Sequence, residues 1–400
     1  MQKKSLLALA VGAALAGSAL AADVTLYGIV DTGLVYLHQG TEGLDGSKTN
    51  DSSLGVQSGY GTTSRWGIRG TEELGNGMTV SFKLENGLNV DTGTADNGER
   101  LFGREASLTL AGNFGQISFG RMGGVGSSAG TYDLVFATAE VFDGGDYNIW
   151  GVAHSARYDN MVTYQTPEFA GLQATFQYSF NTDSKNEATS DYREGSSYVD
   201  RYASAAVTGN YGSLQLVAAG EWMNWASYQG ADTQKDGQIY YLGGNYDCGF
   251  AKTFFLGQYF TGMKSVADHS FLGGDSIFDD FYGSRFSYES DGAEGFGLHV
   301  GTIFNALAGE WKVGVYYADA TLRNNTAYDG QTVNSVDDID VNYWGVSGRY
   351  TYYLSKRTSV YLGAGYAEAK VDANDIDAQN ELHDYKLKTT QVYTGLTHTF

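Results

Sequence analysis

Cysteine and proline are almost absent from this 400-residue chain, which contains one of each. A lone cysteine excludes a disulfide scaffold within the chain and a zinc site built from cysteines. A lone proline excludes collagen and proline-rich linkers. Basic residues are also few: 25 Lys and Arg stand against 46 Asp and Glu, so the formal charge is −21. Nucleic-acid binding needs a basic surface, and we therefore expect no nucleic-acid partner.

Long apolar runs are missing after the first 21 residues. No later stretch has 18 consecutive apolar residues, so none of them predicts a transmembrane helix. What the chain does contain is 55 Gly, 30 Tyr, 20 Phe and 6 Trp. This composition favours many β-strands joined by tight turns.

The first 21 residues have the three parts of a secretory signal peptide. Lys3 and Lys4 form a charged start, Leu6 to Leu20 form an apolar centre, and Ala19-Leu20-Ala21 fits the small-x-small cleavage rule. A transmembrane anchor is the alternative, but it needs a longer apolar run. We therefore predict a Sec signal peptide at 1–21, cleaved after Ala21, and one exported β-barrel domain at 22–400.

Apolar and polar residues then alternate with a period of two. Ala174, Phe176, Tyr178 and Phe180 share one face of such a run, and polar residues occupy the other face. A tilted strand needs about 9–11 residues to cross a bilayer, whereas strands of soluble proteins have about 5–6. We expect the apolar faces to contact lipid and the polar faces to line water. A soluble β-sandwich, with its apolar faces inside, is the alternative.

The connections between these runs alternate between short and long. Tight connections lie at 74–77, 112–115, 210–213, 306–309 and 354–357, and long polar ones at 38–63, 122–156, 181–197, 264–294, 323–340 and 371–388. An up-and-down barrel with turns at one end and loops at the other has this pattern. Sixteen strands fit the spacing well, 14 or 18 remain open, and 281–305 has no clear assignment.

Five segments, in order, resemble the general porins of Gram-negative outer membranes, most closely the beta-proteobacterial branch. The match includes the first strand, the second strand with its turn, strands four and five, strands fourteen and fifteen, and a terminal assembly signal: DVTLYGIVDTGLVY (23–36), SRWGIRGTEELGNG (64–77), LFGREASLTLAGNFGQISFGRM (101–122), TYYLSKRTSVYLGAGYA (351–367) and Thr-His-Thr-Phe400. The resemblance implies an all-β fold, a 16-stranded antiparallel transmembrane β-barrel with loop 3 folded into the lumen, and a homotrimer in the outer membrane. It also implies that the barrel-assembly machinery reads Phe400. Contact with outer-membrane lipid and lipopolysaccharide is expected as well.

A porin catalyses no reaction, so its functional site is a constriction whose radius and electric field select solutes. We expect passive diffusion of ions and small hydrophilic solutes, with no cofactor and no metal. Arg65 and Arg69 are four residues apart and share a strand face, and Lys83 lies on the polar face of the next strand. The resemblance assigns Arg65, Arg69 and Arg104 to lumen or eyelet positions. These four side chains form the predicted basic wall.

The long stretch 122–156 is the candidate loop 3. The acids predicted to face the basic wall lie in this loop: Asp133, Glu140, Asp143 and Asp146. The segment 139–146 resembles the acidic loop-tip motif of the family, and Glu140 and Asp146 are the expected facing pair. Arg157 is expected to hold the base of the loop.

Strand parity gives two further expectations. Tyr27 and Asp31 share the inward parity of the first strand. If Arg104 points inward, strict alternation turns Glu105 and the next alternate residues outward, and Arg121 then falls on the outer face of strand five. We therefore predict that Arg121 contacts a neighbouring subunit.

Three other functions remain open. A sugar-selective uptake channel would use aromatic residues of loop 3, and the candidates are Tyr132, Phe136, Phe142, Tyr147 and Trp150. A barrel enzyme would need His paired with Ser or Asp, and none of the six His lies in a motif that indicates this. An adhesin or phage-receptor role of the loops is compatible with a channel. The acidic loops favour a weak preference for cations.

Overall fold

The computed structural model describes residues 23–43, 46–98, 100–128, 130–184, 194–226, 235–263, 287–289, 291–323, 325–328, 333–336, 338–372 and 384–400. The predicted signal peptide and its cleavage site lie outside these residues. No helix of the described residues is long and apolar enough to cross a membrane. The helix α2 spans only Val135–Ala139.

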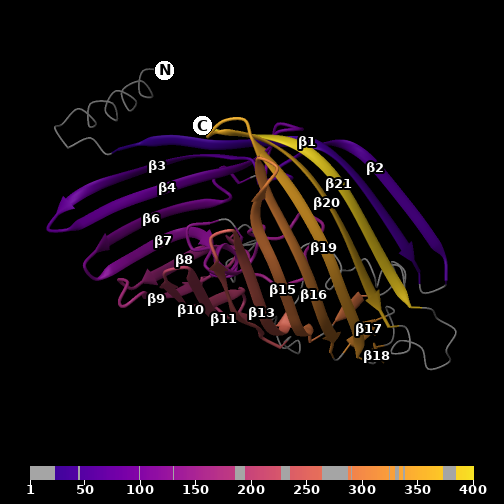
Figure 1. Cartoon of the computed structure of the whole chain (residues 1–400). Coiled ribbons are helices and arrows are strands. Elements are labelled where there is room, and N and C mark those ends of the chain that lie inside the picture. The colour runs from indigo at the N-terminus through magenta and orange to yellow at the C-terminus, as the bar shows by residue number, and fades with distance from the viewer. Residues whose placement is uncertain are drawn as a thin grey trace, which may run out of the picture.

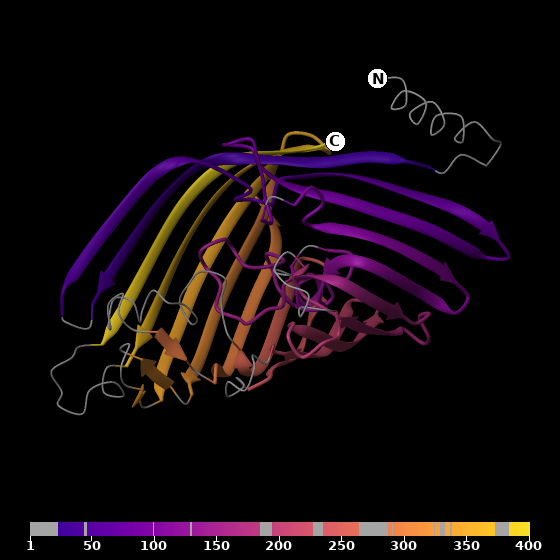
Figure 2. The same ribbon diagram turned by 180° about the vertical axis from the view of Figure 1, so that it is seen from behind.

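Sixteen antiparallel strands form a closed barrel (Figures 1 and 2). Each strand pairs with the next one along the chain, and the last strand pairs with the first. The barrel strands are β1 (Thr25–Glu42), β3 (Arg65–Gly75), β4 (Met78–Asn89), β6 (Glu105–Gly112), β7 (Gly115–Gly123), β8 (Arg157–Gln165), β9 (Leu172–Ser179), β10 (Arg201–Tyr211), β11 (Leu214–Asn224), β12 (Gly237–Asp247), β13 (Ala251–Met263), β15 (Ala293–Ala306), β16 (Gly309–Leu322), β19 (Ile339–Tyr353), β20 (Thr358–Val371) and β21 (Tyr385–Thr399). The predicted fold class and strand count are confirmed.

Further strands among the described residues lie outside this ring. β2 (Lys48–Ser58) pairs with the second half of β1, and β5 (Thr94–Ala95) pairs with the end of β4. β14 (Ser287–Glu289), β17 (Asn325–Tyr328) and β18 (Val333–Val336) form a separate three-stranded sheet. Within the unassigned stretch 281–305, the barrel strand therefore begins at Ala293, while 281–286 and 290 lie outside the described residues.

All five predicted tight connections separate consecutive barrel strands. At the turn between β3 and β4, Gly75, Asn76 and Gly77 have φ values of 83°, 52° and 73°. Glycine adopts this left-handed region without the steric cost of a Cβ atom, and asparagine tolerates it better than most residues. The local sequence therefore determines where the chain reverses.

The barrel wall has the predicted two faces. Large apolar side chains such as Leu34, Leu108, Phe119, Leu242 and Leu362 are exposed on its outside. Closure of the ring pairs the backbone groups of the strands, which lipid could not satisfy. At the seam, the N–H and C=O groups of Phe400 both bond to Gly28.

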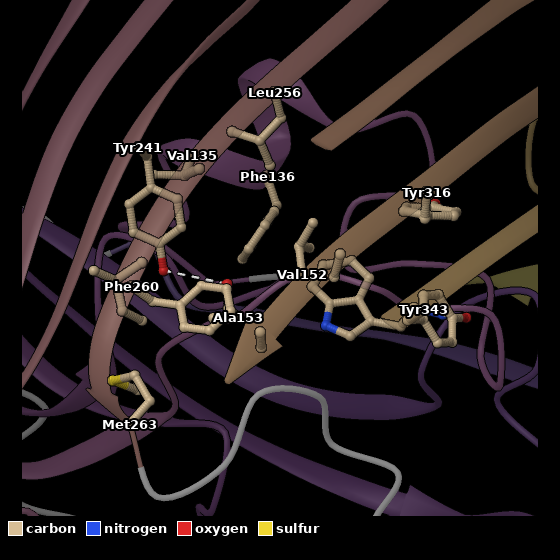
Figure 3. Packing of buried hydrophobic residues seen from close by; sticks show 14 of the residues in the cluster. Val135, Phe136, Val152, Ala153, Tyr241, Leu256, Phe260, Met263, Tyr316 and Tyr343 are labelled. Atoms are coloured by element: carbon tan, nitrogen blue, oxygen red, sulfur yellow. Dashed lines mark hydrogen bonds between the residues drawn. The ribbon is translucent and has the colours of Figure 1, made fainter. Parts of the chain in front are cut away.

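Residues 124–156, here called loop 3, connect β7 to β8 and contain α2. Their apolar side chains, including Phe136, Ile149 and Val152, are fully buried in one cluster with inward-facing residues of the strands. Figure 3 shows Val135 and Phe136 beside Tyr241 and Leu256. This packing fixes loop 3 against the strands from β10 to β21.

Candidate functional site

The strand register places the predicted basic side chains on one face of the wall. Tyr27 lies opposite Gly67, and Arg69 lies opposite Lys83, so these residues share a face. The Arg69 guanidinium lies 5.1 Å from the centre of the Tyr27 ring. The alternate residues of the same strands, such as Leu26 and Phe82, share the opposite face. The structure thus brings Tyr27, Arg65, Arg69 and Lys83 together on the inward face.

Two carboxylates on the same face pair with this basic wall. Arg104 Nε donates to Glu85 Oε1 at 2.7 Å, and Lys83 Nζ lies 2.7 Å from Glu105 Oε2. Tyr27 also donates to Glu85, at 2.9 Å. Two of the four predicted cations are therefore neutralised by their immediate neighbours. The charges of Arg65 and Arg69 have no ion pair within the described residues.

The expected outward orientation of Glu105 is wrong. Glu85 lies opposite Glu105 in the β4–β6 ladder, and Leu108 lies opposite Phe82, so Glu105 and Ser107 face inward and Leu108 faces outward. Arg104 also reaches the interior because it precedes β6, where strand alternation does not yet apply. The outward parity of Arg121 does not depend on Glu105, because the β6–β7 ladder places Arg121 opposite Ala106, on the face that Leu108 and Phe119 share.

Arg121 is engaged within its own chain. Its Nε donates to Gly103 O at 2.8 Å, and its Nη1 lies 2.7 Å from Asp159 Oδ1. The ladder between β7 and β8 is irregular here, between Gly120 and Met122. A contact of Arg121 with a second subunit stays a prediction.

Among the four acids of loop 3, Glu140 is buried with 2% of its surface exposed. Its Oε2 accepts the backbone N–H groups of Phe142, Gly144 and Gly145 at 3.1, 2.8 and 3.0 Å. Its Oε1 accepts the Tyr316 hydroxyl at 2.5 Å. Glu140 therefore shapes the tip of the loop and joins it to β16, and it does not face the basic wall.

Asp146 is buried as well. It accepts hydrogen bonds from Ser347, from Tyr393 at 2.5 Å and from Gln391 at 3.1 Å, and Arg349 lies 4.0 Å away. Burial raises the pKa of the Asp146 carboxyl, whereas Arg349 and the hydroxyl donors oppose this shift. The expectation that Glu140 and Asp146 form the acidic face is wrong, because both are used to hold the loop in place.

The other two acids differ from each other. Asp133 is buried and accepts the N–H of Ala137, in the first turn of α2, at 3.2 Å. Asp143 is exposed, and the described residues offer it no hydrogen bond or ion pair. Its backbone has a φ of 61°, and it is the first of three consecutive residues with positive φ at the loop tip. Asp143 is thus the acid of loop 3 that remains available on an open surface.

Two other predicted residues hold connections in place. Asp31 is fully buried and accepts the Gly61 N–H, the Tyr361 hydroxyl at 2.8 Å and the Thr397 hydroxyl at 2.5 Å. It therefore joins the segment before β3 to the last two strands. Arg157 Nη2 donates to Ser128 O at 2.9 Å, which joins the end of loop 3 to its beginning.

Two basic residues on the opposite wall were not predicted from the sequence. Lys312 of β16 and Arg349 of β19 are direct partners in the ladder, on the face that Tyr316 and Ser347 share. Arg349 Nη1 donates to Gly61 O at 2.7 Å, and its guanidinium lies 5.0 Å from the centre of the Phe142 ring. Strand parity alone could have placed both cations on the inward face.

A cavity of about 210 Å³ lies where these parts meet. Loop 3, the segment before β3, and β19 all contribute to it. The lining includes two cations, one exposed acid and several aromatic rings: Tyr60, Arg65, Phe142, Asp143, Tyr147, Trp150, His154 and Arg349. A cavity with this lining can bind a small polar solute and orient its charges.

Most aromatic residues that could form a sugar-binding ladder are buried. Tyr132, Phe136, Phe142 and Trp150 are each at most 7% exposed, whereas Tyr147 is 40% exposed. The Tyr147 ring stacks on Tyr60, with 4.1 Å between centroids. The loop thus presents one supported aromatic face and not a series of rings.

Comparisons with known proteins agree with this architecture. The model of the Gram-negative porin family matches residues 8–372. The chain is 31% identical, over the full length of both chains, to an outer membrane porin protein of Bordetella pertussis. It is 34% identical to outer membrane porin protein 32 of Delftia acidovorans over 62% of this chain and 67% of that protein. The solved anion-selective porin from Comamonas acidovorans has a TM-score of 0.58 at 23% identity, covering 95% of this chain and 100% of that one, which shows a shared fold.

Proposed function

Since this chain belongs to the Gram-negative porin family and forms an outer-membrane β-barrel channel, we propose that loop 3 constricts its lumen and that a charged gap controls passive diffusion. Ions and small hydrophilic solutes pass this gap, and no bond chemistry takes place. The relatives that the chain matches are named as porins, and we infer no enzymatic activity for this chain.

One observation carries this proposal. Loop 3 is fastened by buried carboxylates to strands far along the chain, yet Asp143 stays exposed in the same cavity as Arg65 and Arg349. Opposite charges that face each other across a narrow, partly desolvated space create a strong local field. Such a field orients dipolar solutes and filters ions while allowing them to leave.

Assembly, membrane insertion and partners belong to the same proposal. We propose a homotrimer, insertion by the barrel-assembly machinery through the Phe400 signal, and contact of the rim with lipid and lipopolysaccharide. We also retain the weak preference for cations, because the acidic loops would concentrate cations at the entrance. The sugar-selective alternative is less favoured, because the described loop 3 presents one exposed ring and a sugar slide needs several.

Planar-bilayer recording of the refolded protein tests the proposal. We expect stable openings in three equal conductance steps, and a reversal potential in a salt gradient that changes when Arg65 is neutralised. A barrel that conducts no current, or a reversal potential that does not change in this variant, would contradict a field-controlled constriction. Loss of saturable sugar binding in the same variant, with ion selectivity unchanged, would favour the sugar-selective alternative.

A further inference from the structure

The cavity at the tip of loop 3 has the arrangement of a binding subsite. We propose that it binds zwitterionic solutes with a planar apolar ring, the class of the aromatic α-amino acids. This inference rests on the proposed channel function and names a solute class for its constriction. It depends on three features of the cavity: a cation, an acid and a supported ring.

Arg65 is the cation with donors to spare. Its only hydrogen bond among the described residues goes from Nη1 to Thr63 O, at 3.4 Å. Arg349, by contrast, already donates to Gly61 O and lies over the Phe142 ring. A guanidinium presents five N–H groups in a plane and binds a carboxylate with two of them. Arg65 is therefore the natural partner for the carboxylate of a solute.

Asp143 is the matching acid. It lines the same cavity as Arg65, but the two side chains form no ion pair in the described structure. The cavity separates the two charges, so a solute that carries both an ammonium and a carboxylate group can bridge them. A solute with one charge would satisfy one partner and face repulsion from the other. This arrangement favours a zwitterion over a simple anion or cation.

Tyr147 supplies the ring surface. One of its faces stacks on Tyr60, which is 3% exposed, while Tyr147 itself is 40% exposed. The neighbouring Asp146, whose buried carboxylate accepts the Tyr393 hydroxyl at 2.5 Å, fixes the backbone beside Tyr147. Stacking on a fixed ring costs little conformational entropy.

Trp150 and Gly145 pack closely against each other at the tip of loop 3. Trp150 lines the cavity and is 6% exposed, and its indole Nε1 has no hydrogen-bond partner among the described residues. A Cβ atom on Gly145 would lie 2.1 Å from the Trp150 ring, so glycine is required for this close approach. The loop tip is thus packed tightly beside the cavity.

Block of the ion current by L-phenylalanine tests the proposal in the full-length channel. The analogues are 3-phenylpropionate, which lacks the ammonium group, 2-phenylethylamine, which lacks the carboxylate, and cyclohexylalanine, which lacks the planar ring. In the unchanged protein we expect phenylalanine to bind roughly tenfold more tightly than each analogue. Equal block of the unchanged protein by all four compounds would by itself overturn the proposal.

Single substitutions test which side chain binds which group of the solute. We expect Arg65→Gln to weaken phenylalanine block roughly tenfold. The matched control is Arg69→Gln, which removes the same charge from the same face of β3 but lies outside the cavity lining. It should alter ion selectivity and keep the affinity for phenylalanine. Equal loss of block in both variants would mean that general charge, and not this site, binds the solute.

Asp143→Asn tests whether the Asp143 carboxylate binds the ammonium group of the solute. It should weaken phenylalanine block but leave 3-phenylpropionate block equal or stronger, because the acid that repels a simple carboxylate is gone. Weaker binding of both compounds would contradict the proposed role of Asp143. An open, ion-conducting channel without phenylalanine block would refute the solute class alone, whereas a channel that never opens would refute the proposed function itself.

Discussion

Lys83 Nζ lies 2.7 Å from Glu105 Oε2 on the inward face of the barrel wall, and the Thr131 hydroxyl of loop 3 donates to the other oxygen of Glu105 at 2.6 Å. A charge expected to stand alone in the basic wall is thus neutralised by its cross-strand neighbour. The same carboxylate also holds loop 3. We therefore expect ion selectivity and the position of loop 3 to be coupled at Glu105.

Glu105→Gln is predicted to leave Lys83 with only its 3.7 Å contact to Glu85, a carboxylate that Arg104 already neutralises, and to shift ion selectivity toward anions. The amide can still accept a hydrogen bond from Thr131, so loop 3 should keep its position. The reversal potential in a salt gradient measures the shift. Glu168→Gln is the control, because Glu168 is exposed in the turn between β8 and β9. An equal shift in both variants would mean that only net charge matters.

Tyr316→Phe is predicted to loosen the tip of loop 3. The variant removes the hydroxyl that donates to buried Glu140, and an unsatisfied buried acceptor costs roughly 1–3 kcal/mol. We expect a lower unfolding midpoint in urea and more frequent current fluctuations. Tyr317→Phe is the matched control, since the Tyr317 hydroxyl is on the other face of β16 and donates to Asp319 in an exposed hydrogen bond. Quiet currents in both variants would argue against a role of this bond in holding the loop.

Gly33→Ala is predicted to impair closure between the first and last strands. A Cβ atom at Gly33 would lie 2.1 Å from Thr394 O and 2.7 Å from the Gly395 Cα, and backbone atoms of a sheet cannot move away easily. We expect a destabilisation of roughly 1–3 kcal/mol. Gly55→Ala is the control, because nothing lies within 4 Å of a Cβ atom there. The temperature at which the folded barrel unfolds in detergent compares the two, and equal temperatures would show that the seam tolerates the extra atom.

The buried carboxyl of Asp146 predicts a pH-dependent stability. Because burial raises its pKa in the folded state, the folded protein binds this proton more tightly than the unfolded chain. The stability that this group contributes is fully present below its unfolded pKa of about 3.9 and is lost as the pH rises through the folded value. Asp146→Asn cannot titrate at this position. The stability of the unchanged protein relative to Asp146→Asn should therefore increase as the pH falls from about 8 to about 3.

Urea unfolding of both proteins across this pH range measures the difference. Groups that titrate in both proteins cancel in the comparison. A difference that is constant with pH, or one that decreases on acidification, would contradict the raised pKa.

Local patterns in the sequence determined the barrel. Alternation with a period of two depends only on neighbouring residues, and so do glycine-rich turns such as Gly75–Gly77. These two local patterns determine which segments are β-strands, where the turns lie and which side of the wall faces lipid. Parity also placed Lys83 correctly. It failed at Arg104, which lies just before its strand, where the alternation has not begun.

The tertiary structure alone decided which charges remain available in the interior. Glu140 and Asp146 look like Asp143 in the sequence, but their hydrogen-bond donors Tyr316, Ser347 and Tyr393 lie 176, 201 and 247 residues further along the chain. Only the closed barrel brings these donors to the tip of loop 3, and a buried carboxylate with several donors is no longer free to act on solutes. Asp143 has no such donors among the described residues and keeps its exposure. The sequence by itself thus determined a membrane barrel with a charged interior, and the fold decided which of its charges face the solute.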